Sequence, residues 1–265
     1  MEFSWQQKER YTRNFALKEI GQDGQNRLLH SRVLVVGAGA LGSAALYYLA
    51  AAGVGTLGVA DGDLVDLSNL QRQILHSEPR LGMEKATSAQ KTLSMLNSDI
   101  QIHVYPHRMT PDNIQGIIRH YDFVIDATDR FEAKFLINDA CVLEHKPYVH
   151  AGIVRFGGQV MTYVPGKGPC LRCLMEDVPH HAPTSAEVGV LGACVGVLGS
   201  IQATEAIKYL LGIGDLLTGR ILQFDGLKMT FRISRMRTSP SCKVCGRAAV
   251  VKDLKATPSD YEERP

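Results

Sequence analysis

Residues 31–61 read SRVLVVGAGALGSAALYYLAAAGVGTLGVAD, and this stretch decides the fold. Arg32–Val36 is short, apolar and rich in β-branched residues, which is typical of a strand buried in a parallel sheet. Residues 40–52 are rich in Ala and Leu and predict a helix that ends at Gly53. Thr56–Ala60 predicts a second strand. A strand, a glycine turn, a helix and a second strand form a βαβ unit.

Segments of strand and helix character keep alternating after this unit. The sequence predicts helices at 82–96, 111–120, 130–144 and 189–212, and strands at Gln101–Tyr105, Phe123–Ile125, Tyr148–Val149, Gly158–Tyr163, Ile221–Phe224 and Met229–Ile233. The last two strands flank Asp225-Gly226, which indicates a hairpin. We therefore predict an α/β fold with a Rossmann-like, doubly wound and mostly parallel sheet, extended by antiparallel strands.

The chain has the length of one large α/β domain, at 265 residues. We expect a single domain over residues 1–246, followed by a peripheral tail at 247–265. Its expected parts are a helical segment at 5–30, a nucleotide-binding half at 31–150 and a second half at 151–246. Within the second half, the polar and proline-containing residues 176–188 predict a mobile loop.

Composition excludes several classes of protein. There are 29 Lys and Arg against 27 Asp and Glu, which is too balanced for binding nucleic acid by bulk charge. No run of about 18 apolar residues exists, so we expect no membrane span. The first ten residues, MEFSWQQKER, lack the apolar core of a secretory signal, so we expect a cytoplasmic protein.

The glycines after the first strand have the spacing of a dinucleotide-binding turn. Gly37 permits the tight turn, Gly39 lets backbone amides approach a phosphate, and Gly42 lets the helix pack on the strand. The first turn of the helix then presents free N–H groups to an anion. Asp61 ends the next strand, about 20 residues further on, where an acidic residue can bind a ribose hydroxyl. The pattern predicts an adenosine nucleotide.

Polar donors follow this second strand, which distinguishes ATP from a nicotinamide cofactor. They comprise Asp63, Ser68, Asn69, Leu70, Gln71 and Arg72, with Lys85 shortly after them. A nicotinamide needs an apolar slot, whereas a triphosphate needs several positive donors and a Mg²⁺ ion held by a carboxylate. Taken alone, Lys85 is better explained as a lysine on a helix surface.

A second acidic cluster, Asp126-Ala-Thr-Asp129-Arg130, follows the strand at Phe123–Ile125. The carboxyl ends of neighbouring parallel strands share one crevice. Asp129 could therefore hold Mg²⁺ across from Arg72 and Lys85. The alternative is that Thr128 and Asp129 cap the following helix, and a cap would leave carboxylate lone pairs for a metal, so the two roles are compatible.

Four of the six cysteines form two C-x-x-C pairs, Cys170 with Cys173 and Cys242 with Cys245. Four thiolates in two such pairs match a structural, tetrahedral Zn²⁺ site. One pair alone would also fit a redox dithiol. Cys141 and Cys194 lie in apolar helical segments, and we interpret both as packing residues.

Taken together, these motifs resemble the ThiF/MoeB/HesA family of E1-like adenylyltransferases, and most closely its MoeB-type sulfur-carrier activating enzymes. The resemblance extends from about Arg10 to Gly246. It rests on RYTRNF, GAGALG, D-x-D, SNLQRQ, the lysine of GMEKA, DATDR, the two CxxC pairs and GVLGSIQATEAIK.

The resemblance implies a homodimer that binds ATP and Mg²⁺, with Zn²⁺ as a structural ion. Its substrate would be a small ubiquitin-like sulfur carrier, held by the 151–246 half, whose C-terminal Gly-Gly carboxylate is adenylated with release of pyrophosphate. The residues implied in nucleotide binding are Gly37, Gly39, Ala40, Gly42, Asp61, Asp63, Ser68, Asn69, Leu70, Gln71, Arg72, Lys85, Asp129 and Arg130. Asp61 would take the ribose, Asn69, Arg72 and Lys85 the phosphates, and Asp129 the Mg²⁺.

Four residues are implied in catalysis, namely Arg13, Arg72, Lys85 and Asp129. Arg13 resembles an arginine that reaches the ATP of the partner subunit, although by itself it would be explained as a surface arginine. The substrate carboxylate is already ionised at neutral pH, so we assign no catalytic base.

One position departs from the family pattern. Many members have a cysteine in the loop where this chain has Ser185, and a serine cannot form a persulfide or an acyl disulfide. We therefore expect adenylation without covalent capture of the carrier, and a 176–188 loop that covers the Gly-Gly tail. The alternatives are a NAD(P)-dependent oxidoreductase with a structural zinc, which rests on the glycine motif and Asp61, and a non-catalytic scaffold.

Overall fold

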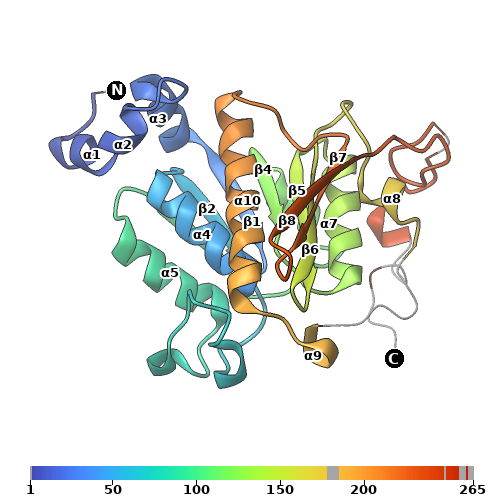
Figure 1. The fold of residues 1–265 in the computed structure, drawn as a ribbon, viewed down its shortest axis with the longest axis horizontal. Coiled ribbons are helices and arrows are strands. Elements are labelled where there is room, and N and C mark those ends of the chain that lie inside the picture. The colour runs from blue at the N-terminus through green and yellow to red at the C-terminus, as the bar shows by residue number, and fades with distance from the viewer. Residues whose placement is uncertain (1, 178–184, 248, 257–260, 262–265) are drawn as a thin grey trace.

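The computed structural model describes residues 2–177, 185–247, 249–256 and 261. Its centre is an eight-stranded sheet with the strand order β3-β2-β1-β4-β5-β6-β7-β8 (Figure 1). The strands are β1 (Arg32–Val36), β2 (Thr56–Ala60), β3 (Gln101–Tyr105), β4 (Phe123–Asp126), β5 (Tyr148–Val154), β6 (Gly157–Tyr163), β7 (Arg220–Asp225) and β8 (Thr230–Arg235). Strands β1 to β5 are parallel, and β6, β7 and β8 pair antiparallel. The predicted sheet, mostly parallel and extended by antiparallel strands, is confirmed.

Helices cover both faces of the parallel strands (Figure 1). The α-helices are α1 (Trp5–Arg10), α2 (Thr12–Phe15), α3 (Gly21–His30), α4 (Ala40–Ala52), α5 (Lys85–Leu96), α6 (Ile114–Ile118), α7 (Phe131–Leu143), α8 (Leu171–Leu174), α9 (Ser185–Val188) and α10 (Gly192–Leu211). Short 3₁₀ turns lie at Leu67–Asn69, Glu78–Arg80 and Leu254–Ala256. No helix of the described residues is long and apolar enough to cross a bilayer.

Strand β1 shows why the parallel strands read as continuous apolar runs. Val33 and Val35 belong to the core formed with α4, α5 and α10. Leu34 and Val36, between and after them, belong to the core formed with α6 and α7. Successive side chains of a strand point to opposite faces, so a strand covered on both faces must be apolar at every position.

The predicted helices are present. Helix α4 has the predicted bounds, whereas α5, α6, α7 and α10 begin later than predicted. Residues 82–84 do not begin α5, because Val65 pairs with them through Val65 N–H to Met83 O at 2.8 Å and Gly82 N–H to Val65 O at 2.9 Å. These bonds and the positive φ of Gly82 hold residues 82–84 outside the helix, which begins at Lys85. The hairpin at Asp225-Gly226 is confirmed.

Two predicted segments fall partly outside the described residues. In the 176–188 loop, residues 178–184 lie outside them and 185–188 form α9. The tail expected at 247–265 is described only in part. Val251 and Leu254 of that tail are buried in the core beside α6 and α7, because they complete the packing around α7.

Two helical glycines give a matched test of packing. A Cβ added to Gly42 would lie 1.9 Å from the carbonyl oxygen of Gly37, whereas a Cβ on Gly196 would meet nothing within 4 Å. We expect Gly42→Ala to lower the free energy of unfolding by about 1–3 kcal/mol through overpacking. Gly196→Ala should raise it by up to about 1 kcal/mol through helix propensity. Urea unfolding measures both, and a change of the same sign in the two variants would contradict this packing.

Candidate functional site

The candidate site lies at the carboxyl edge of the parallel strands. The strand order reverses between β1 and β4, and ligands of open α/β sheets bind at such a switch point. The glycine turn after β1 and loop 127–130 after β4 are in direct contact there. Gly37 has a φ of 100°, and a Cβ on it would lie 2.6 Å from the carbonyl oxygen of Ala127. Ala127 N–H also donates to Val36 O at 2.9 Å.

The three motif glycines have different surroundings. Gly37 needs its left-handed φ, and Gly42 needs the absence of a side chain to pack against the Gly37 carbonyl. Gly39 is more open, since a Cβ there would meet nothing nearer than Gln73 Nε2 at 3.6 Å. The turn is therefore tightly packed at Gly37 and Gly42 but leaves free space at Gly39. Helix α4 begins at the next residue, Ala40. The N–H groups of this first turn are the donors that a phosphate can use.

Asp61 connects the end of β2 to the glycine turn. Its Oδ2 accepts from Ala38 N–H at 2.8 Å and its Oδ1 accepts from Asp63 N–H at 2.9 Å. Burial raises the pKa of Asp61, and the charge of Lys85 opposes that shift. A carboxylate accepts about four hydrogen bonds. Acceptor capacity remains for a ribose hydroxyl.

Lys85 is buried, so its interpretation as a helix-surface lysine is wrong. Only 6% of the residue is exposed, and its Nζ lies 3.3 Å from Asp63 Oδ2. The cause is the backbone pairing of residues 64–65 with 82–84, which brings the start of α5 beneath Asp63. Burial would raise the pKa of Asp63, but Lys85 and Arg108 outweigh it and hold that pKa below the usual value.

Arg108 is a cation at this edge that the sequence analysis missed. Its Nη2 lies 3.5 Å from Asp63 Oδ1. The residue follows the end of β3, so the rule that carboxyl ends share one edge could have found it.

The SNLQRQ segment folds into a compact turn of its own. Asp66 Oδ1 accepts from Ser68 N–H at 2.8 Å and from Ser68 Oγ. Arg72 Nη1 donates to Ser68 O at 3.1 Å, and Gln73 Nε2 donates to Asn69 Oδ1 at 2.6 Å. These bonds fix the direction of the Arg72 and Asn69 side chains.

The first turn of α10 supports the same segment from outside. A Cβ on Gly192 would lie 2.9 Å from Gln71 O and 3.1 Å from the Cα of Arg72. Leu70 and Gln71 lie between Asn69 and Arg72 in the SNLQRQ segment. The long helix of the second half of the chain therefore fixes a predicted phosphate-binding segment of the first half.

Loop 127–130 presents Asp129 to solvent. Asp129 is exposed, and no described residue forms a hydrogen bond or ion pair with it. The alternative that Thr128 and Asp129 cap α7 is wrong. The N-cap position of α7 is Arg130, where no side chain caps the helix, and Thr128 Oγ1 instead donates to Asp126 Oδ1 at 2.6 Å. The Asp129 carboxylate is therefore available as an oxygen ligand for a cation.

Asp126, at the end of β4, is completely buried beneath this loop. Its Oδ2 accepts from His150 Nδ1 at 2.7 Å and lies 3.4 Å from Lys134 Nζ. Burial would raise the pKa of Asp126, but Lys134, His150 and Thr128 outweigh burial and lower it to about 2. Burial lowers the pKa of His150, so its ring is neutral near pH 7.

Arg13 does not lie at this edge of the chain. It lies in α2, and Tyr11, two residues before it, packs on Gly53, which follows the far end of α4. Asn97 at the end of α5 holds the Tyr11 hydroxyl from the same side, at 2.9 Å. The N-terminal helices are thus at the opposite edge of the sheet from the carboxyl ends (Figure 1).

The two cysteine pairs meet although they are far apart in sequence. Their four Sγ atoms lie within 4.8 Å of one another, with 3.6 Å between Cys170 and Cys242 and 3.3 Å between Cys173 and Cys245. Tetrahedral zinc with Zn–S bonds of about 2.3 Å requires sulfur atoms about 3.8 Å apart, so the cluster fits that ion. The neighbouring Cys170 thiol lowers the pKa of Cys173, which favours the thiolate that binds a metal.

A buried ion pair that the sequence did not reveal attaches the first cysteine pair to α7. Arg172 Nε and Nη2 donate to Asp139 Oδ2 at 2.9 and 2.7 Å. Cys141 and Cys194 are both buried and lie outside the cluster, as expected of packing residues.

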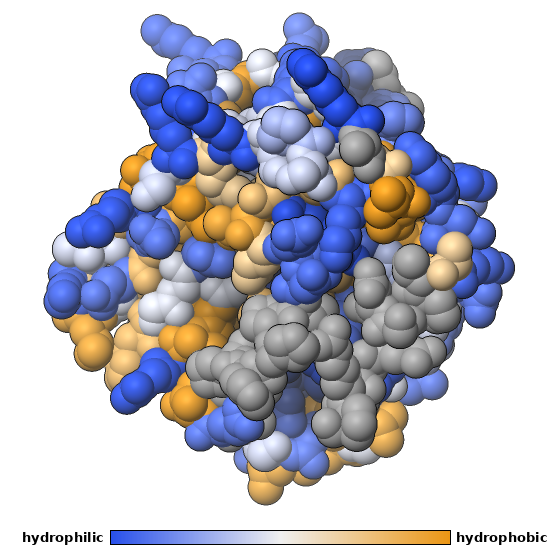
Figure 2. Space-filling view, turned by 90° about the vertical axis from the view of Figure 1, so that its right-hand side faces the viewer, coloured by the Kyte–Doolittle hydropathy of each residue, from blue (hydrophilic) through white to orange (hydrophobic). Residues whose placement is uncertain are grey.

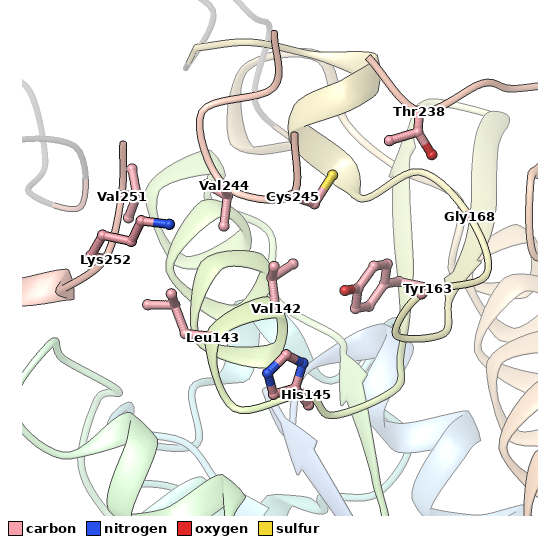
Figure 3. Close-up of a pocket in the computed structure, with 11 residues that line it drawn as sticks. Val142, Leu143, His145, Tyr163, Gly168, Thr238, Val244, Cys245, Val251 and Lys252 are labelled. Carbon is pink, nitrogen blue, oxygen red and sulfur yellow. The ribbon is translucent and has the colours of Figure 1, made fainter. Parts of the chain in front are cut away.

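A cavity of about 520 Å³ lies beside Cys245, one member of the cysteine cluster (Figure 3). Val142, His145, Tyr163, Val244 and Cys245 are among its lining residues. His145 precedes β5, which places the cavity at the amino edge of the sheet. None of the predicted nucleotide-binding residues lines it. We therefore do not place the nucleotide chemistry there. The right-hand side of the molecule in Figure 1 is mainly hydrophilic where it is coloured in Figure 2, with separate hydrophobic patches.

The low pKa of Asp126 predicts a loss of stability in acid. The carboxylate is stabilised only in the folded state, so its contribution is complete above the ordinary pKa of 3.8 and is lost as pH falls toward about 2. We expect the stability difference between the wild type and Asp126→Asn to decrease by about 2 kcal/mol over that interval. Urea unfolding of both proteins at several pH values measures it, and a constant difference would contradict the assignment.

Comparisons with known proteins agree with this arrangement. The model of the ThiF family matches residues 11–244. The chain is 46% identical over 261 residues to the SAMP-activating enzyme E1 of Haloferax volcanii, which covers 97% of this chain and 94% of that protein. It is 43% identical over 269 residues to the sulfur carrier protein adenylyltransferase of Thermus thermophilus, covering 99% of this chain and 98% of that one.

A longer relative and a solved structure extend the comparison. Adenylyltransferase and sulfurtransferase MOCS3 of Drosophila persimilis is 44% identical over 256 residues, which are 96% of this chain but only 56% of that protein. The crystal structure of Escherichia coli MccB with MccA-N7isoASN superposes with a TM-score of 0.80 at 22% identity, over 93% of this chain and 76% of that one, and shows a shared fold. The matched region contains the glycine turn, the SNLQRQ segment and loop 127–130, and the chain belongs to the ThiF family of E1-like adenylyltransferases, as a MoeB-type member.

Proposed function

We propose that this chain adenylates the C-terminal glycine carboxylate of a small ubiquitin-like sulfur-carrier protein, using ATP and Mg²⁺ and releasing pyrophosphate. One observation carries the proposal. The glycine turn contacts the loop that carries the exposed Asp129, and Asp61 connects this turn to the end of β2, near the buried Lys85. The Haloferax and Thermus relatives, named for activating SAMP and for acting on a sulfur carrier protein, support this substrate class.

In the proposed complex, each nucleotide group has a partner of matching chemistry. The open N–H groups at Gly39 and Ala40 bind phosphate, and Asp61 binds the ribose. Asn69, Arg72 and Lys85 bind the phosphates, and Asp129 holds Mg²⁺. The surrounding contacts come from Gly37, Gly42, Asp63, Ser68, Leu70, Gln71 and Arg130.

The proposed chemistry is governed by charge. A carrier carboxylate oxygen attacks the α-phosphorus, the bond to the bridging oxygen breaks, and pyrophosphate leaves. Attack joins two anionic groups, so fixed positive donors must stabilise the developing charge. Arg72 and Lys85 supply such donors. Mg²⁺ contributes further neutralisation when bound. The carboxylate is ionised at neutral pH, and the reaction needs no protein base.

The position of Arg13 supports a homodimer as the active form. In its own subunit, Arg13 lies at the edge of the sheet opposite the glycine turn. It is also exposed, so it is accessible to a second copy. A contribution from Arg13 to the reaction therefore requires the nucleotide of the partner subunit.

An apolar surface beside the site is suited to a protein partner. It consists of the β7–β8 hairpin and the ends of neighbouring segments, with Leu227, Met229, Phe231, Ile233, Phe156 and Leu191 all exposed. Apolar side chains gathered in this way usually mark a protein interface. We propose that the carrier docks here and that its tail passes along α9 toward the first turn of α10, in reach of Arg72.

The serine at position 185 limits the proposed chemistry to activation. Ser185 is the first residue of α9, and its side chain lies outside the described part of the structure. Its hydroxyl cannot form a persulfide, so the acyl-adenylate is the proposed product. We propose, too, that the 176–188 loop covers the carrier tail, which protection of the loop from protease by carrier would test.

An oxidoreductase with NAD(P) remains the second candidate, because the glycine motif and Asp61 suit either nucleotide. The cations near Asp63 favour ATP. A ligand that binds only the folded state raises the unfolding temperature. Stabilisation by ATP with Mg²⁺ but not by NAD supports the adenylyltransferase, and the reverse supports the oxidoreductase.

Exchange of pyrophosphate into ATP tests the proposed reaction. We expect exchange that depends on a carrier ending in Gly-Gly, and a loss of about 100-fold or more in Arg72→Ala and Asp129→Ala, because each removes a charge that stabilises the transition state. Lys91→Ala removes an exposed lysine on α5 and serves as the control, with unchanged exchange. If the wild type shows no exchange with any carrier that ends in Gly-Gly, the proposed function is refuted. Near-normal exchange in the variants refutes the roles of Arg72 and Asp129.

The zinc content tests the role of the cysteine cluster. We expect one zinc ion per chain, its loss in Cys242→Ser, and a lower unfolding temperature after chelation, because metal binding contributes to folding. Cys141→Ala changes a buried cysteine outside the cluster and should keep its zinc. Equal zinc content in the two variants would argue against the site.

A further inference from the structure

Lys134 is a buried lysine whose bonds the reaction proposed above does not use. It lies in the first turn of α7 and is only 4% exposed. Its Nζ donates to Thr128 O at 2.6 Å and to Ala151 O at 2.8 Å, and lies 3.4 Å from Asp126 Oδ2. An ammonium is rarely buried unless it is paired, because its desolvation is costly. A buried lysine in this position therefore requires an explanation.

Neutralising Asp126 does not account for this geometry. The contact with the carboxylate is the longest of the three, and His150 already donates to the same oxygen at 2.7 Å. The two short bonds go to backbone carbonyls instead. The ammonium is therefore directed at the backbone of loop 127–130 and of β5.

The carbonyl of Thr128 belongs to the peptide group whose nitrogen is that of Asp129. A bond to this carbonyl fixes the peptide plane from which the Asp129 side chain projects. Asp126 holds the same residue from its other end, accepting from Thr128 N–H at 3.1 Å and from Thr128 Oγ1 at 2.6 Å. Asp129 itself has no partner among the described residues, so only its backbone directs its carboxylate.

We infer that Lys134, with Asp126 and Thr128, is a positioning residue that fixes the Thr128–Asp129 peptide and so directs the Asp129 carboxylate toward its metal ion. The inference rests on the proposed function, because that function makes Asp129 the Mg²⁺ ligand. Groups that orient a metal ligand commonly change metal affinity by about 10–100-fold when removed. Lys134 does not touch the nucleotide in this scheme and acts only through the backbone.

The test measures metal binding rather than turnover. Mn²⁺ replaces Mg²⁺ and is titrated into the protein with AMPCPP, a non-hydrolysable ATP analogue, and free Mn²⁺ is followed by electron paramagnetic resonance. The variant is Asp126→Asn with Lys134→Met, which removes both buried charges together. The amide that replaces the Asp126 carboxylate keeps an oxygen that accepts from Thr128, so the main loss is the pair of bonds from the ammonium.

We expect this double variant to fold and to bind Mn²⁺ about 10–100-fold more weakly. Lys146→Met is the matched control, because Lys146 Nζ donates to two backbone carbonyls, Tyr121 O at 2.8 Å and Arg119 O at 3.0 Å, away from the site. Its Mn²⁺ affinity should not change. An unchanged affinity in the folded double variant, or an equal loss in Lys146→Met, would overturn the inference.

Two further measurements keep the test decisive if the double variant does not fold, or if Asp129 is not the metal ligand. Thr128→Val keeps both buried charges but removes one bond that holds the same peptide, and we expect a several-fold weaker Mn²⁺ affinity; no change overturns the inference. In an Asp129→Ala background the double variant should cause no additional loss, and additive losses overturn it. If Asp129→Ala alone leaves Mn²⁺ binding intact, the metal role of Asp129 fails, whereas carrier-dependent exchange tests the adenylation separately.

Discussion

Direct backbone contact between the glycine turn and loop 127–130 is the constraint on which the site depends. The Gly37 position lies so close to the Ala127 carbonyl that a Cβ would be 2.6 Å from it, and Gly42 approaches the Gly37 carbonyl still more closely. These approaches are possible only without side chains. They bring the N–H groups that suit phosphate next to the carboxylate that suits a divalent cation, from segments about 90 residues apart.

Ion pairs within the protein hold the charged side chains at this edge in place before any ligand binds. Asp63 holds both Lys85 and Arg108, and Asp126 lies beneath the loop with Lys134 and His150. Each buried cation has an acidic partner, so the cost of desolvation is offset within the fold. Donors held in this way need little reorganisation when negative charge develops. The carboxylates permit the burial of Lys85 and Lys134, and backbone carbonyls set the direction of the Lys134 ammonium.

Helix α10 connects the two halves of the chain. Its Gly199 packs so closely on α4 that a Cβ would lie 2.4 Å from Leu41 O, and its first turn packs on Gln71 and Arg72. At the far side of the sheet, the cysteine cluster joins two loops separated by about 70 residues. The antiparallel strands between these fixed points leave an apolar surface open, beside the first turn of α10. A partner bound there would be close to the segment that holds Arg72.

The sequence by itself determined the βαβ unit, the sheet type, the glycine turn and the cysteine pairs. Each depends on local requirements: apolar runs for buried strands, positive φ for Gly37, and fixed ligand spacing for Cys170 and Cys173. Tertiary structure alone decided the burial of Lys85, the placement of Arg108 and the bonds of Lys134. It also placed Arg13 at the edge of the sheet opposite the glycine turn. Whether a charged side chain is buried depends on which distant segments bring it a partner, and short-range sequence patterns do not contain that information.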